Sequence, residues 1–191
     1  MMRIITGSAR GTKLATPPGL ETRPTAERTK EAVFSSIQYL TQHAEVLDLF
    51  GGSGQMALEA LSRGAAEAVI VDSAQEAIRA IRENLVRTHL EGKAAVIQAN
   101  SLRYLETLEK QFSLVFLDPP YAKGLLPQVL RIMARRGTVR QGGLVICESA
   151  STEDVFGTDD ELKQHYTVVK TAKYGKAFIT YLEPLRERGV L

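Results

Sequence analysis

The stretch Val46-Leu47-Asp48-Leu49-Phe50-Gly51-Gly52-Ser53-Gly54 indicates the fold of this chain. Its apolar start predicts a buried strand over residues 46–50, and the segment after the glycines predicts a helix over residues 55–63. Glycines in such a turn permit positive φ and let a ligand approach the backbone. The turn also fits the G-x-G-x-x-[GA] dinucleotide pattern, which is weak evidence alone because any tight strand-to-helix turn can use glycines.

From residue 45 onward, short apolar runs alternate with helical segments. We expect further strands at residues 68–72, 94–98, 114–117 and 144–148, and further helices at residues 74–89, 102–108 and 125–136. Apolar strands separated by helices indicate a parallel sheet covered on both faces. Residues 166–171 and 177–182 predict a closing antiparallel hairpin. The α/β chain thus has the layout of class I S-adenosylmethionine-dependent methyltransferases, a mostly parallel Rossmann-like sheet with a C-terminal antiparallel hairpin.

The first 40 residues differ from the remainder of the chain. We expect an extended arm or hairpin over residues 1–23, a helix over residues 26–40, and a Rossmann-like domain over residues 41–191, all forming one compact unit. Residues 1–30 carry six Lys and Arg but only two Glu, although the whole chain of 191 residues has a net charge of only +2. This asymmetry indicates either a polyanion partner or a solvated tail.

The composition excludes several classes of protein. Apolar content of 44% and charged content of 24% are ordinary for a soluble globular protein, and no apolar stretch approaches the ~18–20 residues that span a bilayer. One cysteine, Cys147, excludes an internal disulfide, so we expect a cytoplasmic protein. We expect no metal site, because the three histidines are dispersed at positions 43, 89 and 165.

Three acidic or polar residues, near the ends of predicted strands or just after them, favour a nucleoside cofactor. Asp72 lies 18 residues after Gly54, where a carboxylate can accept hydrogen bonds from ribose hydroxyls of NAD or S-adenosylmethionine. Asp48 would repel a pyrophosphate but suits the cationic methionine end of S-adenosylmethionine. Asn100 could bond an adenine edge, cap the following helix, or do both. The predicted cofactor residues are Asp48, Phe50, Gly51, Gly52, Gly54, Asp72, Ser73, Asn100 and Ser101.

The tetrad Asp118-Pro119-Pro120-Tyr121 follows another apolar strand. The acid and the Pro119 carbonyl can accept both N–H bonds of an amine on an aromatic ring, which helps to localise the nitrogen lone pair toward a methyl donor. Tyr121 offers a stacking face for a base turned out of its helix or loop. The alternative is a Pro-Pro turn with a capping acid and a packing tyrosine. We predict that all four residues are catalytic.

The chain resembles the RsmD family of bacterial ribosomal RNA methyltransferases. The resemblance rests on Arg3-Ile4-Ile5-x-Gly7, Thr22-Arg23-Pro24-Thr25 with Arg28 and Glu31-Ala32-x-Phe34, the glycine turn, Leu58-Glu59-Ala60-Leu61-Ser62-Arg63-Gly64-Ala65, and Leu117 with the tetrad. It departs from the family at three cofactor positions, where Gly51 replaces the usual alanine, Asn100 the usual aspartate, and Asp72 the more frequent glutamate.

The resemblance implies methyl transfer from S-adenosylmethionine to the exocyclic N2 amine of a guanine in small-subunit ribosomal RNA, within an assembled or assembling subunit. It also implies that the arm grips RNA, for which we predict Arg10, Lys13, Arg23 and Arg28. We expect a monomer with no membrane partner. Two alternatives stay open, an adenine-N6 or other amino-methyltransferase acting on DNA or RNA, and a non-catalytic RNA-binding module for ribosome assembly.

Overall fold

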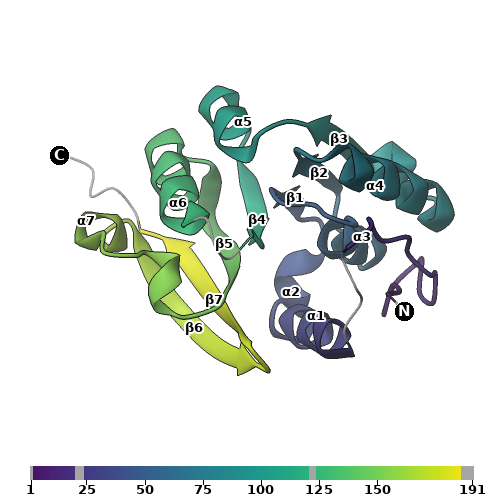
Figure 1. The fold of residues 1–191 in the computed structure, drawn as a ribbon, viewed down its shortest axis with the longest axis horizontal. Helices are drawn as coiled ribbons and strands as arrows, with labels where there is room; N and C mark the ends of the chain where they lie inside the picture. The colour runs from purple at the N-terminus through teal and green to yellow at the C-terminus, as the bar shows by residue number, and fades with distance from the viewer. Residues whose placement is uncertain (1, 20–23, 121–123, 186–191) are drawn as a thin grey trace. The chain divides into compact units, whose positions relative to one another are not determined.

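The computed structural model describes residues 2–19, 24–120 and 124–185 (Figure 1). Contacts divide the chain into two compact units, Met1–Ser101 and Leu102–Leu191, and each is described by itself. The boundary predicted at residue 40 stays a prediction. None of the helices in these described ranges is long and apolar enough to cross a membrane.

The first unit contains three parallel strands in the order β3-β2-β1. Their register places Leu47 of β1 opposite Val69 of β2, and Val71 of β2 opposite Ile97 of β3. The apolar residues of β1 are buried, which explains the continuous apolar run in the sequence. The elements of the unit are α1 (Pro24–Ser36), α2 (Gln38–Thr41), β1 (Glu45–Asp48), α3 (Gln55–Ser62), β2 (Glu67–Asp72), α4 (Gln75–Thr88), η1 (Glu91–Lys93) and β3 (Ala94–Gln98).

The single helix expected over residues 26–40 is wrong, because α1 ends at Ser36 and a second short helix follows. The Ser36 hydroxyl donates to the carbonyl oxygen of Ala32 at 3.0 Å, a bond that bends and weakens helices. Ile37 then leaves the helical conformation with φ −112° and ψ 17°. Val33, Phe34 and Ile37 are buried as the apolar stripe predicts, but Leu40 is exposed.

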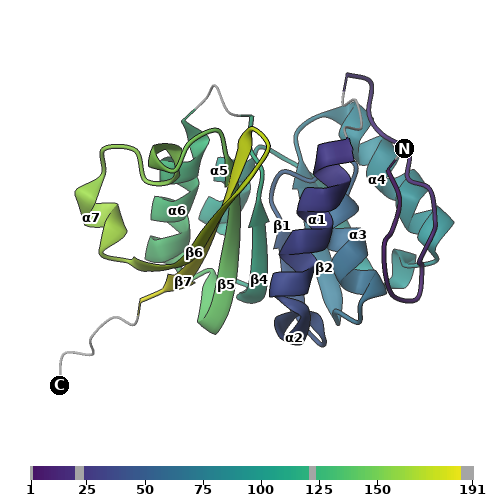
Figure 2. The same cartoon turned by 90° about the horizontal axis from the view of Figure 1, so that it is seen from below.

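The arm forms a hairpin-like loop joined by one isolated antiparallel bridge between Arg3 and Lys13. Backbone bonds from Ile4 N to Thr12 O at 3.0 Å and from Gly11 N to Ile4 O at 2.8 Å close the loop. Ile4 is fully buried. The arm lies against α3 and α4 (Figure 2), where Ala9 N donates to the Ser62 hydroxyl and Ala15 N donates to the Asn84 amide oxygen.

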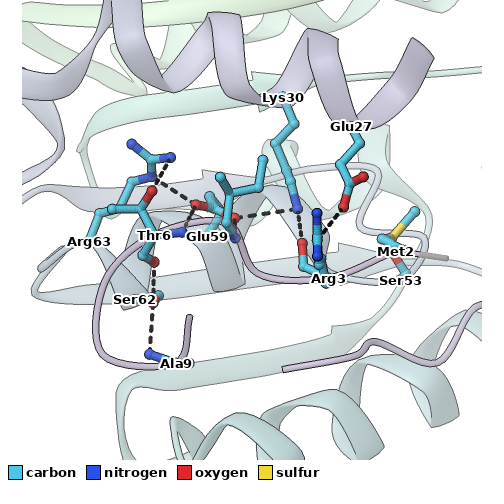
Figure 3. Close-up of polar contacts among 11 residues, drawn as sticks. Met2, Arg3, Thr6, Ala9, Glu27, Lys30, Ser53, Glu59, Ser62 and Arg63 are labelled. Carbon is cyan, nitrogen blue, oxygen red and sulfur yellow. Dashed lines mark hydrogen bonds and ion pairs between the residues drawn. The ribbon is translucent and has the colours of Figure 1, made fainter. Parts of the chain in front are cut away.

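A buried carboxylate on α3 holds the arm (Figure 3). Glu59 accepts hydrogen bonds from the backbone N–H of Ile5 at 2.8 Å and of Thr6 at 3.0 Å. It also forms ion pairs with Lys30 at 3.3 Å and with Arg63 at 2.8 Å. These contacts join the arm, α1 and α3 at one point.

The second unit places its strands in the order β4-β5-β7-β6, with β4 and β5 parallel and the last pairs antiparallel. The predicted closing hairpin is therefore confirmed, and so is the α/β class. Cys147 is fully buried in β5, and burial raises the pKa of its thiol. The remaining elements are α5 (Ser101–Thr107), β4 (Phe112–Leu117), α6 (Leu125–Arg136), β5 (Val139–Ser149), η3 (Glu153–Val155), α7 (Asp160–Lys163), β6 (Tyr166–Tyr174) and β7 (Ala177–Pro184).

Strand β5 begins five residues earlier than residues 144–148 predict. Its register against β4 shifts between Phe112 and Leu114, which is an irregularity that absorbs the Gly142-Gly143 pair. A Cβ on Gly143 would lie 2.9 Å from the carbonyl oxygen of Ser113, so only glycine permits this close pairing. The expected strand began only after this pair of glycines, whereas β5 continues through them.

We predict that Gly7→Ala destabilises the protein far more than Gly11→Ala. Both glycines have positive φ, +92° and +84°, but a Cβ on Gly7 would lie 1.8 Å from the Ser62 carbonyl oxygen, whereas a Cβ on Gly11 meets nothing within 4 Å. Gly7→Ala should lower the free energy of unfolding by about 3 kcal/mol, and Gly11→Ala by about 1 kcal/mol. Urea denaturation measures both values, and equal losses would contradict close docking of the arm on α3.

Candidate functional site

The glycine turn after β1 is held by the neighbouring strand β2. Gly51 N donates to Val71 O at 2.8 Å, and Gly52 N donates to the Asp72 carboxylate at 2.9 Å. Gly52 and Gly54 have φ of 56° and 77°, and Gly54 is the N-cap of α3. Positive φ at these positions favours glycine. The turn follows β1 directly, so its backbone lies at the carboxyl edge of the parallel strands.

Gly51 is needed for space as well as for a tight turn. A Cβ at this position would lie 2.5 Å from the Ile70 side chain and 3.1 Å from the Ile81 side chain. The alanine usual in the family would therefore require Ile70 to shift. Glycine at this position therefore leaves room for the Ile70 side chain on β2.

Asp72 is positioned at the end of β2 by two backbone N–H groups. One carboxylate oxygen accepts from Gly52, and the other accepts from Ala74 at 2.8 Å. Each oxygen has a further lone pair, so the half-buried carboxylate can also accept bonds from a pair of hydroxyls. Ser73 follows it and is exposed.

Asp48 is a buried acid at the end of β1, with only 3% of its surface exposed. Burial raises the pKa of this carboxyl to about 7, and the charge of Asp72 adds to the increase. Backbone N–H groups of Ala57 and Phe50 oppose the shift, and the Ala57 bond is long at 3.4 Å. A cation bound beside Asp48 would restore its charge, so the site fits a positively charged ligand group.

Asn84 is a buried polar residue that the sequence analysis missed. Its amide oxygen accepts from Ala15 N at 2.7 Å, and its amide nitrogen donates to Ala15 O at 2.8 Å and to Ser53 O at 2.9 Å. It therefore ties the arm to the glycine turn. Asn84 lies on the apolar face of α4, where Ile81 and Leu85 are also buried. A polar residue on that face could have indicated a buried hydrogen-bonding role.

Asn100 and Ser101 lie where β3 gives way to α5. Ser101 is the first residue of α5 and is buried, whereas Asn100 precedes the helix and is exposed. This position suits an N-cap, and the Asn100 side chain is exposed, so both predicted roles remain compatible.

The tetrad follows β4 directly, in the second unit. Asp118 and Pro120 are exposed, Pro119 is buried, and Tyr121 lies outside the described residues. Pro119 and Pro120 line a cavity of about 510 Å³ whose other walls come from the start of α6 and from β5 and the segment after it. The acid predicted to hold an amine thus lies next to residues that line a cavity of ligand size.

The predicted RNA-binding residues are only partly brought together. Arg10 and Arg28 are exposed and line one cavity of about 260 Å³ with Arg3, which the sequence analysis did not select. Glu27 also lines this cavity and pairs with Arg3 at 3.1 Å. Lys13 is exposed elsewhere on the arm, and Arg23 lies outside the described residues.

Within the ranges that the structure describes, no group of three or more His, Cys, Asp or Glu residues could hold a metal ion. On α6, Arg131 in the middle of the helix and Arg135 in its last turn form ion pairs with Asp159 and Glu106. These pairs favour a structural role for the two arginines.

Comparison with known proteins extends over nearly the whole chain. Residues 2–183 match the family model described as Conserved hypothetical protein 95. Ribosomal RNA small subunit methyltransferase D of Escherichia coli K12 is 34% identical over 148 residues, which are 78% of this chain and 74% of that protein. The solved structure of Escherichia coli YhhF superposes with a TM-score of 0.82 at 30% identity, over 96% of this chain and 97% of that one. A precorrin-6y C5,15-methyltransferase from Geobacter metallireducens shares the fold, with a TM-score of 0.70 at 17% identity over 89% of this chain and 92% of that one.

We predict that Asp48→Asn stabilises the protein at high pH. The pKa of Asp48 is about 7 in the folded state against an ordinary 3.8, so its stabilising contribution is complete below about pH 4 and is lost as the pH rises through 7. Asparagine carries no charge, so the variant should gain up to about 4 kcal/mol over the wild type at pH 8, and little at pH 4. Denaturation at both pH values measures this difference. The exposed Asp160→Asn is the control, and an equal gain in both variants would contradict the assignment to Asp48.

Proposed function

The chain belongs to the RsmD family of ribosomal RNA methyltransferases, and we propose that it methylates the exocyclic N2 amine of a guanine in small-subunit ribosomal RNA. The observation that carries this proposal is the exposed Asp118 at the end of β4, followed by two prolines that line a cavity. A carboxylate in this place can accept an N–H bond from the target amine, which helps to localise the nitrogen lone pair for attack on a methyl group. The similar Escherichia coli protein, whose name specifies small-subunit ribosomal RNA, supports the choice of RNA.

We assign the cofactor to the glycine turn of the first unit. S-adenosylmethionine, when bound, supplies an activated methyl group on a sulfonium, whose C–S bond breaks as the N–C bond forms, leaving S-adenosylhomocysteine. Asp48 would hold its cationic ammonium group, and Asp72 its ribose hydroxyls. The fit rests on the raised pKa of the buried Asp48, which a cation would reverse, and on the lone pairs left on Asp72. The other predicted residues of this site are Phe50, Gly51, Gly52, Gly54, Ser73, Asn100 and Ser101.

Asp118 and the Pro119 carbonyl act on the target amine. Accepting its two N–H bonds turns the lone pair out of conjugation with the ring, and positioning of that lone pair contributes much of the rate enhancement. After transfer, the nitrogen must lose one proton. Asp118 is exposed and can accept that proton and pass it to water. Tyr121 is the predicted stacking face for the base.

The arm is the proposed RNA contact, through Arg10, Lys13, Arg23 and Arg28. Arg10 and Arg28 lie around one cavity, which supports a shared phosphate-binding role for these two residues. We propose that the protein works in the cytoplasm as a monomer on an assembling or assembled subunit.

Mapping the methylated nucleotide tests this function. Purified protein is incubated with methyl-labelled S-adenosylmethionine and small-subunit RNA, either naked or in the subunit, and the digested RNA is examined by mass spectrometry. We expect N2-methylguanosine at one position. N6-methyladenosine would favour the other amino-methyltransferase function. RNA binding with neither methylation nor calorimetric binding of the cofactor would favour the non-catalytic module.

Asp118→Ala should lower the rate of methyl transfer by about 100-fold or more, because the amine loses the carboxylate that positions it. Affinity for S-adenosylmethionine should change little, since Asp118 is not among the predicted cofactor residues. Single-turnover kinetics and calorimetry measure the two effects. The exposed acid Asp160 of the same unit provides the control variant Asp160→Ala. Wild-type turnover in Asp118→Ala would contradict the proposed role of Asp118 in holding the target amine.

Replacing both Arg10 and Lys13 by Gln should weaken RNA binding and flatten its salt dependence. Each lost phosphate contact lowers the slope of log affinity against log salt by about 0.7 to 0.9. The control removes the same charge at Arg79 and Lys163, which are exposed and paired with Glu76 and Asp160. Filter binding over a range of salt concentrations measures the slopes. An unchanged slope in the arm variant would make the arm an ordinary solvated segment.

A further inference from the structure

The cavity beside Pro119 and Pro120 lies entirely within the second unit and has a volume of about 510 Å³. Cavities of about 300–1,000 Å³ commonly hold small organic ligands. Three acidic residues line it, Glu148, Glu153 and Asp154, and they differ in how they are held.

Glu148 is held by the sheet at the same level as Asp118. Strands β4 and β5 are parallel, and their register places Leu117 opposite Cys147. Asp118 follows Leu117 and Glu148 follows Cys147, so the two acids lie one residue beyond this pair. Neighbouring strands lie about 4.8 Å apart, which brings the two acids close together. Glu148 also pairs with Ile179 of β7, so its backbone is fixed from the other side. Figure 1 shows β5 between β4 and β7.

The other two acids come from the segment after β5, not from the strand that pairs with β4. Asp154 comes from the turn after β5, where its carboxylate accepts a hydrogen bond from Ser151 N at 2.9 Å. Glu153 begins the short η3 and is exposed. Glu148 is half-buried and is the acid among the three that comes from a strand.

The edge of guanine differs from that of adenine at the atom next to the reacting amine. In guanine the 2-amino group adjoins N1–H, a donor, whereas N1 of adenine is an acceptor. An ionised glutamate accepts hydrogen bonds and donates none. A carboxylate next to the amine site therefore attracts the N1–H of guanine and repels the N1 lone pair of adenine, and an unpaired buried acceptor is costly.

We propose that Glu148 is a specificity-determining residue that accepts the N1–H of the target guanine in this cavity. The inference rests on the proposed function, because it needs a purine amine held at Asp118. It adds a reason for choosing guanine that the tetrad lacks, since a carboxylate and a carbonyl hold the amine of either purine. Glu148 takes no part in the transfer itself.

The test compares two target bases in the same RNA. Small-subunit RNA is prepared with either guanine or 2-aminopurine at the mapped target nucleotide, because 2-aminopurine keeps the 2-amino group but has an unprotonated N1. The ratio of methylation rates on the two RNAs is measured for the wild type, for Glu148→Gln and for Glu153→Gln. This ratio is independent of the fraction of enzyme that is folded.

The wild type should prefer guanine, and Glu148→Gln should reduce the ratio by about tenfold or more, because a glutamine amide can donate to the bare N1. Glu153→Gln removes the same charge from the same cavity and should leave the ratio unchanged. An unchanged ratio in Glu148→Gln, or an equal fall in both variants, overturns the proposal. A wild type that methylates neither RNA overturns the proposed function, and this inference with it.

Discussion

The buried carboxylate of Glu59 is the constraint on which the first unit depends. It is fully buried on α3 and is satisfied by two backbone N–H groups of the arm and by Lys30 and Arg63 (Figure 3). Burial lowers the pKa of the Lys30 ammonium, and Glu59 opposes that change. Lys30 also donates to the carbonyl oxygen of Arg3 at 2.6 Å. A buried ion pair is tolerated only when its remaining hydrogen-bonding capacity is met, so arm, α1 and α3 must dock together.

Docking of the arm also positions the glycine turn after β1. Asn84 bonds both Ala15 of the arm and Ser53 of the turn, so the segment proposed to bind RNA and the turn proposed to bind the cofactor share one buried amide. The turn is also held by Asp72, whose carboxylate bonds Gly52. The backbone of the glycine turn is therefore positioned from two sides by side chains of β2 and α4.

The parallel α/β core could be predicted because its strands are continuous apolar runs that end in polar residues such as Asp48 and Asp72. The errors occur where local patterns compete with longer-range contacts. The apolar stripe through Val33, Phe34 and Ile37 suggests one helix, but the backbone breaks near Ser36. The strand expected at residues 144–148 begins too late, because a shifted register lets β5 include the two glycines before it. The roles assigned to the tetrad and the cofactor residues remain predictions.

The sequence by itself determined the order of strands and helices, the glycine turn, and the tetrad after β4, because these depend on local periodicity and on residues that are neighbours along the chain. Only the tertiary structure decided that Glu59 and Asn84 are buried anchors, that Asp48 has a raised pKa, and that Glu148 lies level with Asp118. These properties arise from burial and from strand register. Both join residues far apart in the chain, so no local pattern records them.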